Sequence, residues 1–215
     1  MPLSLSRLLL KPRECASDWL IIQAYDLACA GQRYSSHNLL VFSCLETRNA
    51  IEQLWFEILT LVHDGEMSED YFLQCRKRSD GFLAAIGQAE PKYRQLSRFS
   101  SLVMEVDSKA PYRGIAWDLG KLKRIWHALS DYCHAHGHPA PTIQSTEWVQ
   151  KGYGLVEEAY KHFKEQMTGG ATALMKPQSM TPNTRIIWDA FIEGKLSEAE
   201  VKLQLVSTAK PQGAT

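Results

Sequence analysis

Apolar residues recur every three or four positions through nearly all of residues 1–167, and strict two-residue alternation is almost absent. A spacing of three and four places side chains on one face of an α-helix, whereas alternation is typical of a strand. The pattern therefore predicts an all-α fold, a helical bundle of about six main helices with a C-terminal helical hairpin. The predicted main helices span residues 14–30, 36–63, 69–88, 92–106, 117–135 and 146–167.

Glycine, proline and capping residues indicate where these helices begin and end. Gly31 stands where a C-terminal glycine is expected, Ser68 can cap the third helix, and Pro91 fits the entry to the fourth. Gly152 and Gly154 lie inside the sixth helix, where each costs roughly 1 kcal/mol relative to alanine. This pair indicates close helix packing or a kink.

A chain of 215 residues with 45% hydrophobic content is long enough for one main core. Glycines and prolines interrupt the helical pattern after residue 167, and a capping box at Ser197–Glu200 begins a last helix. The predicted organisation is a helical bundle over 1–167, a linker over 168–183, a short helical hairpin over 184–207 and a disordered tail over 208–215.

Charge is balanced overall but unevenly distributed. The 24 Lys and Arg residues equal the 24 Asp and Glu residues, so the chain lacks the positive excess of a general nucleic-acid binder. Residues 1–70 carry five basic and ten acidic residues, whereas residues 71–124 carry eleven basic and five acidic ones. The basic region 76–124 can face RNA or another anionic partner, or it can pair with acidic residues folded beside it.

The five cysteines are odd in number and contain no C-x-x-C pair, which argues against a disulfide framework and a zinc knuckle. The apolar run Leu8–Leu10 is cut off by Lys11 and Pro12, and no run approaches the roughly 20 apolar residues of a membrane span. The sequence therefore predicts reduced thiols, no contact with a membrane and a cytoplasmic location.

Candidate chemistry is concentrated on the predicted fifth helix. His127, Asp131 and His134 are spaced four and three apart, so their side chains fall within about 60° of one another on one face. Two histidines and a carboxylate can hold a divalent metal, with His136 or His138 as a further ligand. The alternative is a solvated polar face, with the last two histidines stabilising the helix end through its dipole.

The second helix carries charged residues inside an apolar segment. Arg48 and Glu52 form an i, i+4 pair there. They can be a surface pair worth a few tenths of a kcal/mol, or part of a polar layer that crosses the bundle. Candidate partners for such a layer on the fifth helix are Arg124, Asp131 and His134.

Two short stretches, TRNAIEQL at residues 47–54 and LSDYCH at residues 129–134, resemble divergent members of the HEPN superfamily. The resemblance covers residues 36–166. It implies a bundle of four to five helices of the kind common in prokaryotic toxin, abortive-infection and defence systems. Active members are metal-independent ribonucleases that use an arginine and a histidine on one helix, with four to six residues between them.

This chain has no arginine and histidine at that spacing. The resemblance then implies a composite ribonuclease site, in which His134 transfers protons beside His127, and Arg48 or Arg124 holds the phosphate. A bundle that has lost the catalytic pair can instead be retained for binding, dimerisation or regulation.

The sequence thus predicts an interaction or regulatory protein of a prokaryotic defence or stress system. It would act through a protein partner or as a homodimer and would need no cofactor. Two alternatives stay open, a ribonuclease and a metal-binding bundle. Their candidate residues are Arg48, Arg124, His127 and His134 for the ribonuclease, and His127, Asp131 and His134 for a divalent metal.

Overall fold

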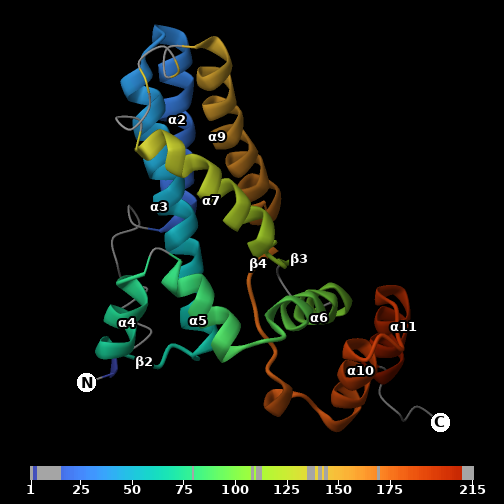
Figure 1. The fold of residues 1–215 in the computed structure, drawn as a ribbon. Helices are drawn as coiled ribbons and strands as arrows, with labels where there is room; N and C mark the ends of the chain where they lie inside the picture. Colours follow the sequence, from blue (N-terminus) through green and yellow to red (C-terminus); the bar gives the residue numbers. More distant parts are fainter. Residues whose placement is uncertain are drawn as a thin grey trace, which may run out of the picture. The chain divides into compact units, whose positions relative to one another are not determined.

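The structure, a computed structural model, confirms the all-α architecture (Figure 1). The chain divides into two compact units, the first formed by Met1–Glu90 with Asp118–Glu165 and the second by Pro91–Trp117 with Gln166–Thr215. The residues that the structure describes are 2–3, 16–78, 80–107, 109, 113–134, 139, 142, 145–168 and 170–209.

In the first unit, α2 (Ser17–Tyr34) and α3 (His37–Val62) form a helical hairpin. Ser36 caps α3 by accepting a hydrogen bond from the N–H of Leu39 at 3.4 Å. α3 is the central helix, because buried residues occupy more than one of its faces. Its fully buried side chains include Leu40, Ile51, Trp55, Ile58 and Leu59.

The prediction that Gly31 ends the first helix is wrong. α2 continues to Tyr34, and Ser35 takes the left-handed conformation at φ 49°. Gly31 is buried, and a Cβ added there would lie 2.5 Å from the hydroxyl oxygen of Tyr153. The residue is therefore small because another helix approaches it, not because a turn requires it.

Two further helices of the first unit are α4 (Glu69–Arg76) and α5 (Gly81–Ala89), where the sequence predicted one helix over 69–88. Ser68 caps α4 as predicted, accepting from the N–H of Tyr71 at 3.2 Å. A Cβ on Gly81 would lie only 1.8 Å from the carbonyl oxygen of Cys75, so only glycine permits this close turn. The strand β1 (Pro2–Leu3) pairs antiparallel with β2 (Met67–Ser68).

The hairpin is covered by α7 (Leu119–Cys133) and α9 (Thr146–Met167), and Figure 1 shows α9 running beside α2. The rings of Tyr25 and Tyr160 stack between α2 and α9, with centroids 3.9 Å apart. A Cβ on Gly152 would lie 2.6 Å from the ring of Tyr132, whereas one on Gly154 would meet nothing within 4 Å. Gly152 therefore marks the predicted close helix packing.

The second unit contains α6 (Tyr93–Val106), α10 (Pro182–Ile192) and α11 (Glu198–Ala209). The last two form the predicted C-terminal hairpin, and the capping box is present, with the Ser197 N–H donating to Glu200 at 2.7 Å. Phe99 of α6 packs edge-on against Trp188 of α10, with centroids 5.3 Å apart. The core of this unit comprises Leu96, Phe99, Leu102, Ile187, Trp188, Val201 and Leu205.

The segment predicted as a linker is partly packed against the second unit. β4 (Gly170–Ala171) pairs in parallel with β3 (Arg113–Gly114), and η3 (Pro177–Ser179) is a short 3₁₀ helix. The Met175 N–H donates to the hydroxyl of Ser100 at 2.8 Å. The sequence predicted that the helical bundle ends at residue 167. The observed second unit also includes residues 91–117, because α6 buries its apolar face against the C-terminal helices.

Candidate functional site

The Arg48 side chain reaches from α3 to α7 within the first unit. Its Nη1 donates to the hydroxyl of Ser130 at 3.1 Å, and its guanidinium carbon lies 4.2 Å from the ring centroid of Trp126. Its Nη2 lies 3.6 Å from Glu52 Oε1. The side chain is only 14% exposed, so its charge is held by a carboxylate, a hydroxyl and an aromatic face.

Glu52 extends this layer by accepting a hydrogen bond from the indole N–H of Trp126 at 2.8 Å. A polar layer between the second and fifth predicted helices is therefore present, but its partners on α7 are not the expected ones. Trp126, Ser130 and Cys133 recur at i, i+4 and i+7 on the face toward α3. The expected partners lie on other faces of the same helix.

The three candidate metal ligands are exposed on α7. The ring of His127 lies edge-on to that of Trp126, with centroids 5.0 Å apart, and His134 caps the helix through an N–H bond to the Ser130 carbonyl at 3.1 Å. Within the described residues, no group of three or more His, Cys, Asp or Glu side chains is placed to hold a metal ion. His136 and His138 lie outside the described residues.

The fourth candidate for a ribonuclease site, Arg124, lies on the surface of α7. Its guanidinium forms an ion pair of 2.6 Å with Glu158 of α9, and the hydrogen bond to this carboxylate raises the pKa of the arginine. Arg48 meets α7 on the Trp126 face, away from the exposed stripe of His127 and His134. The composite ribonuclease site stays a prediction.

Other basic residues of the region 76–124 are also paired with acids. Arg98 donates to both carboxylate oxygens of Glu198 through its Nε and Nη2, and Lys123 lies 3.6 Å from Asp80. By contrast, the three consecutive cations at the end of α4 are exposed. They are Arg76, Lys77 and Arg78.

The described cysteines are free thiols, as predicted. Cys44 and Cys75 are buried, and burial is the main cause that raises the pKa of each. Cys133 is half-buried beside Arg48, and burial raises its pKa although the guanidinium opposes the shift. Cys44, Cys75 and Cys133 are therefore protonated near neutral pH and weakly nucleophilic.

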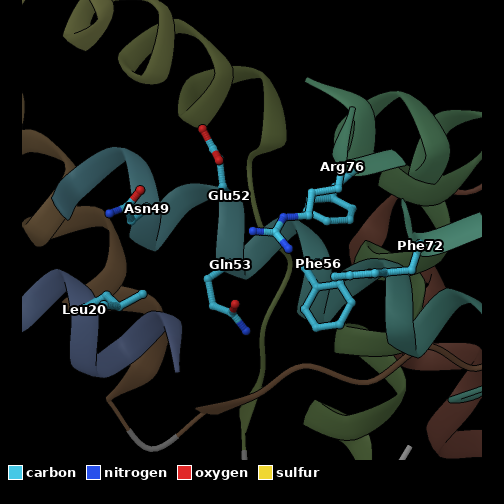
Figure 2. Close-up of a pocket in the computed structure, with 8 residues that line it drawn as sticks. Leu20, Asn49, Glu52, Gln53, Phe56, Phe72 and Arg76 are labelled. Carbon is cyan, nitrogen blue, oxygen red and sulfur yellow. The ribbon is translucent and has the colours of Figure 1, made fainter. Parts of the chain in front are cut away.

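Sequence reasoning missed a pocket of about 330 Å³ beside the first turn of α2 and the second half of α3 (Figure 2). In the figure, the guanidinium of Arg76 extends from α4 toward the centre of the pocket, between Gln53 and Phe56. All four helices α2 to α5 contribute to the wall. The lining residues are Leu20, Asn49, Glu52, Gln53, Phe56, Phe72, Arg76 and Phe82.

The apolar side of this pocket is a cluster of three phenylalanines from three helices. The ring of Phe56 lies 5.2 Å from that of Phe72 and 5.4 Å from that of Phe82, and the last two are 5.8 Å apart. Such tilted and edge-on contacts are the favoured geometries of aromatic pairs. The cluster is therefore a rigid apolar wall beside the cation of Arg76.

A half-buried carboxylate lies next to the pocket where α2 begins. Glu57 accepts hydrogen bonds from the N–H of Ser17 at 3.0 Å, from its hydroxyl at 2.6 Å and from Gln53 Nε2 at 3.2 Å. It thereby satisfies first-turn donors of α2, whose N-cap residue Ala16 has no capping side chain. Burial raises the pKa of Glu57, and the hydrogen bonds from Ser17 and Gln53 oppose that shift.

One signal for this pocket is visible along α3. Phe42, Leu45, Asn49, Gln53 and Phe56 fall within about 80° of one another at 100° per residue. The last three line the pocket, whereas Phe42 and Leu45 are 55% and 42% exposed. A helix face with exposed apolar side chains indicates an interaction surface, but the walls from α4 and α5 depend on tertiary packing.

Comparison of the chain with protein-family models, curated proteins and solved structures found no match. The resemblance to the HEPN superfamily therefore stays a prediction. Each helix of the described residues is too short or too polar to cross a membrane.

Proposed function

We propose that the chain is a protein-interaction module whose first unit binds an amphipathic, acidic segment of a partner protein. The supporting observation is the pocket in which Phe56, Phe72 and Phe82 surround the inward-directed Arg76 (Figure 2). A pocket with an aromatic wall and a cation beside it can accept an apolar anchor and a carboxylate side by side. This proposal develops the interaction function expected from the sequence, and the pocket supports it.

The face of α3 that carries Phe42, Leu45, Asn49, Gln53 and Phe56 determines how long a partner segment can bind. From Phe42 to Gln53 the helix rises by about 16 Å, which matches roughly eleven residues of a second helix lying alongside. Phe42 and Leu45 at the exposed end offer apolar contacts outside the pocket. A partner helix with apolar residues at i, i+3, i+4 and i+7 would follow this face into the pocket.

Charge gives the site its preference for an acidic partner. Arg76 also lines an adjoining hollow of about 460 Å³ on α4, together with Lys77 and Asp70. The carboxylate of Glu52 in the pocket already binds Trp126 and Arg48 on its other side. The exposed cations Arg76 and Lys77 therefore favour carboxylates at this edge of the interface.

The test is selection of binding peptides from a displayed random 16-residue library against the purified chain. We expect enrichment of sequences with apolar residues at helical spacing and at least one Asp or Glu. Binding of the selected peptides should weaken at least tenfold for Arg76→Glu, because an attractive charge in the pocket becomes repulsive. Lys195→Glu, an exposed change in the second unit, is the matched charge control and should bind like the original chain.

The proposal fails if no peptides are enriched, or if the enriched peptides bind Arg76→Glu as tightly as the original chain. The same preparations should be incubated with single-stranded RNA. RNA cleavage that disappears in a folded His134→Ala variant would replace the interaction function with the ribonuclease alternative.

A further inference from the structure

The apolar face of α3 that leads into the pocket borders a second apolar stripe, on α2. Leu20, Leu27 and Tyr34 recur every seven residues on α2, so their side chains fall within about 40° of one another. Leu20 lines the pocket, and Tyr34 is 70% exposed where α2 ends. The two stripes therefore border one surface, which runs from the pocket toward the turn between α2 and α3.

Two opposite charges lie at the two ends of this surface. Glu46 follows Leu45 on α3, and within the described residues its carboxylate accepts only a long hydrogen bond of 3.5 Å, from Asn49 Nδ2. The guanidinium of Arg76 extends toward the centre of the pocket (Figure 2), and it has no hydrogen bond or ion pair within the part of the chain that the structure describes. Neither charge is therefore neutralised by the described fold.

The two carboxylates of α3 that lie nearer to the pocket do have partners. Glu52 lies 3.6 Å from the guanidinium of Arg48, and Glu57 accepts the N–H and the hydroxyl of Ser17. Their charges are compensated inside the first unit. A segment that binds along this surface therefore meets one uncompensated acid, at the exposed end, and one uncompensated base, at the pocket.

Helix geometry gives the distance between these two charges. Arg76 reaches the pocket between Gln53 and Phe56 (Figure 2), and Glu46 precedes Gln53 by two turns of α3. At 1.5 Å per residue, the two charges are about 10–13 Å apart along α3. On a second helix lying alongside, residues i and i+7 are about 10.5 Å apart and within about 20° of one another. The spacing of the two charges thus matches two turns of a bound helix.

We infer that the partner segment is a helix with a basic and an acidic residue seven positions apart, the basic one bound at Glu46 and the acidic one at Arg76. This inference rests on the proposed function and names the charge pattern that the same site selects. The two opposite charges also fix the direction of the bound helix, because a reversed helix would bring its basic residue to Arg76 and its acidic residue to Glu46. Repulsion at Glu46 rejects segments that are acidic at both positions.

The test measures the affinity of the selected peptides by fluorescence anisotropy. We expect most of them to carry Lys or Arg seven residues from an Asp or Glu. Glu46→Lys should weaken their binding at least threefold, because an attractive pair at the edge of the interface becomes repulsive. Replacing the basic residue of the peptide by Glu should restore binding to Glu46→Lys and weaken binding to the original chain. Asp26→Lys is the matched control and should bind like the original chain, because this exposed acid lies about 100° around α2 from Leu27.

Failure of this inference and failure of the proposed function give different results. Peptides that lose affinity for Arg76→Glu but bind Glu46→Lys like the original chain would overturn the inference and leave the proposed function in place. A selection that enriches no peptide would overturn both. If circular dichroism shows that Glu46→Lys does not fold, Glu46→Gln removes the charge and keeps the shape. Equal affinity of the peptides for Glu46→Gln and the original chain would then overturn the inference.

Discussion

At the scale of single residues, Arg48 shows what a sequence can and cannot reveal about a charged group. An arginine inside an apolar helical segment needs partners, and this requirement is visible without a structure. The choice of Trp126 and Ser130 depends on which face of α7 turns toward α3. Histidine and aspartate looked chemically more suitable, but they occupy a face that points to solvent.

His162 leads to a prediction about pH. It is buried in α9, and burial, with a smaller contribution from Lys121, lowers the pKa of its imidazole. At a pH between the lowered pKa of the folded chain and the ordinary pKa of the unfolded chain, His162 is protonated in the unfolded chain and neutral in the folded chain. The free energy of unfolding should therefore fall as the pH decreases from 7 to 5, and His162→Leu should reduce that fall.

Urea denaturation at several pH values measures this effect. His127→Gln is the matched control, because it replaces an exposed histidine of the same unit and should keep the original pH dependence. An unchanged pH dependence in His162→Leu would show that the burial of this imidazole does not contribute.

At the scale of helices, the two glycines of α9 look equivalent in the sequence and differ in the structure. Gly154→Ala should raise the free energy of unfolding by about 0.5–1 kcal/mol, because alanine is the better helix former and the new Cβ meets nothing within 4 Å. Gly152→Ala should lower it by about 1–3 kcal/mol, because its Cβ would press on Tyr132 at 2.6 Å.

Thermal or urea unfolding measures the change in the free energy of unfolding for each variant. The two variants control for one another, because both replace glycine by alanine in the same helix. Opposite signs are expected. If both substitutions raised the free energy of unfolding, this result would contradict the close contact between Gly152 of α9 and Tyr132 of α7.

The break between α4 and α5 illustrates why helix boundaries are harder to predict than helices. The apolar pattern runs on through residues 69–88, and a glycine inside a helix is tolerated at modest cost. Only the close contact between Gly81 and the Cys75 carbonyl shows that the chain turns there. This turn matters for function, because it brings Phe72 and Phe82 to the same pocket.

At the scale of the whole molecule, the two units have separate cores and should respond separately to mutation. Trp188 is 2% exposed in the core of the second unit, so Trp188→Ala should cost that unit about 3–5 kcal/mol. Hydrogen exchange followed by NMR should show lost protection in α6, which packs against this residue.

The amides of α3, in the first unit, are the internal control and should keep their protection in Trp188→Ala. Equal loss of protection in α3 and α6 would mean that the two units unfold as one cooperative body.

The candidate sites were only partly predictable. Periodicity placed Asn49, Glu52 and Gln53 on the second helix, and the histidine stripe on the fifth. Neither pattern shows a pocket, because a pocket needs walls from several helices. Arg76 was visible only as one residue of the basic region 76–124 until packing placed it beside a cavity.

The sequence by itself determined the helical class, the approximate position of most helices, the C-terminal hairpin and several caps, because periodicity and capping act over a few neighbouring residues. The tertiary structure alone decided which faces meet. It assigned α6 to the second unit, gave Gly31 and Gly152 their packing roles, and turned the histidine stripe of α7 to solvent. The reason is that helical periodicity reveals that a face is buried, whereas its partner depends on contacts between residues far apart in the chain.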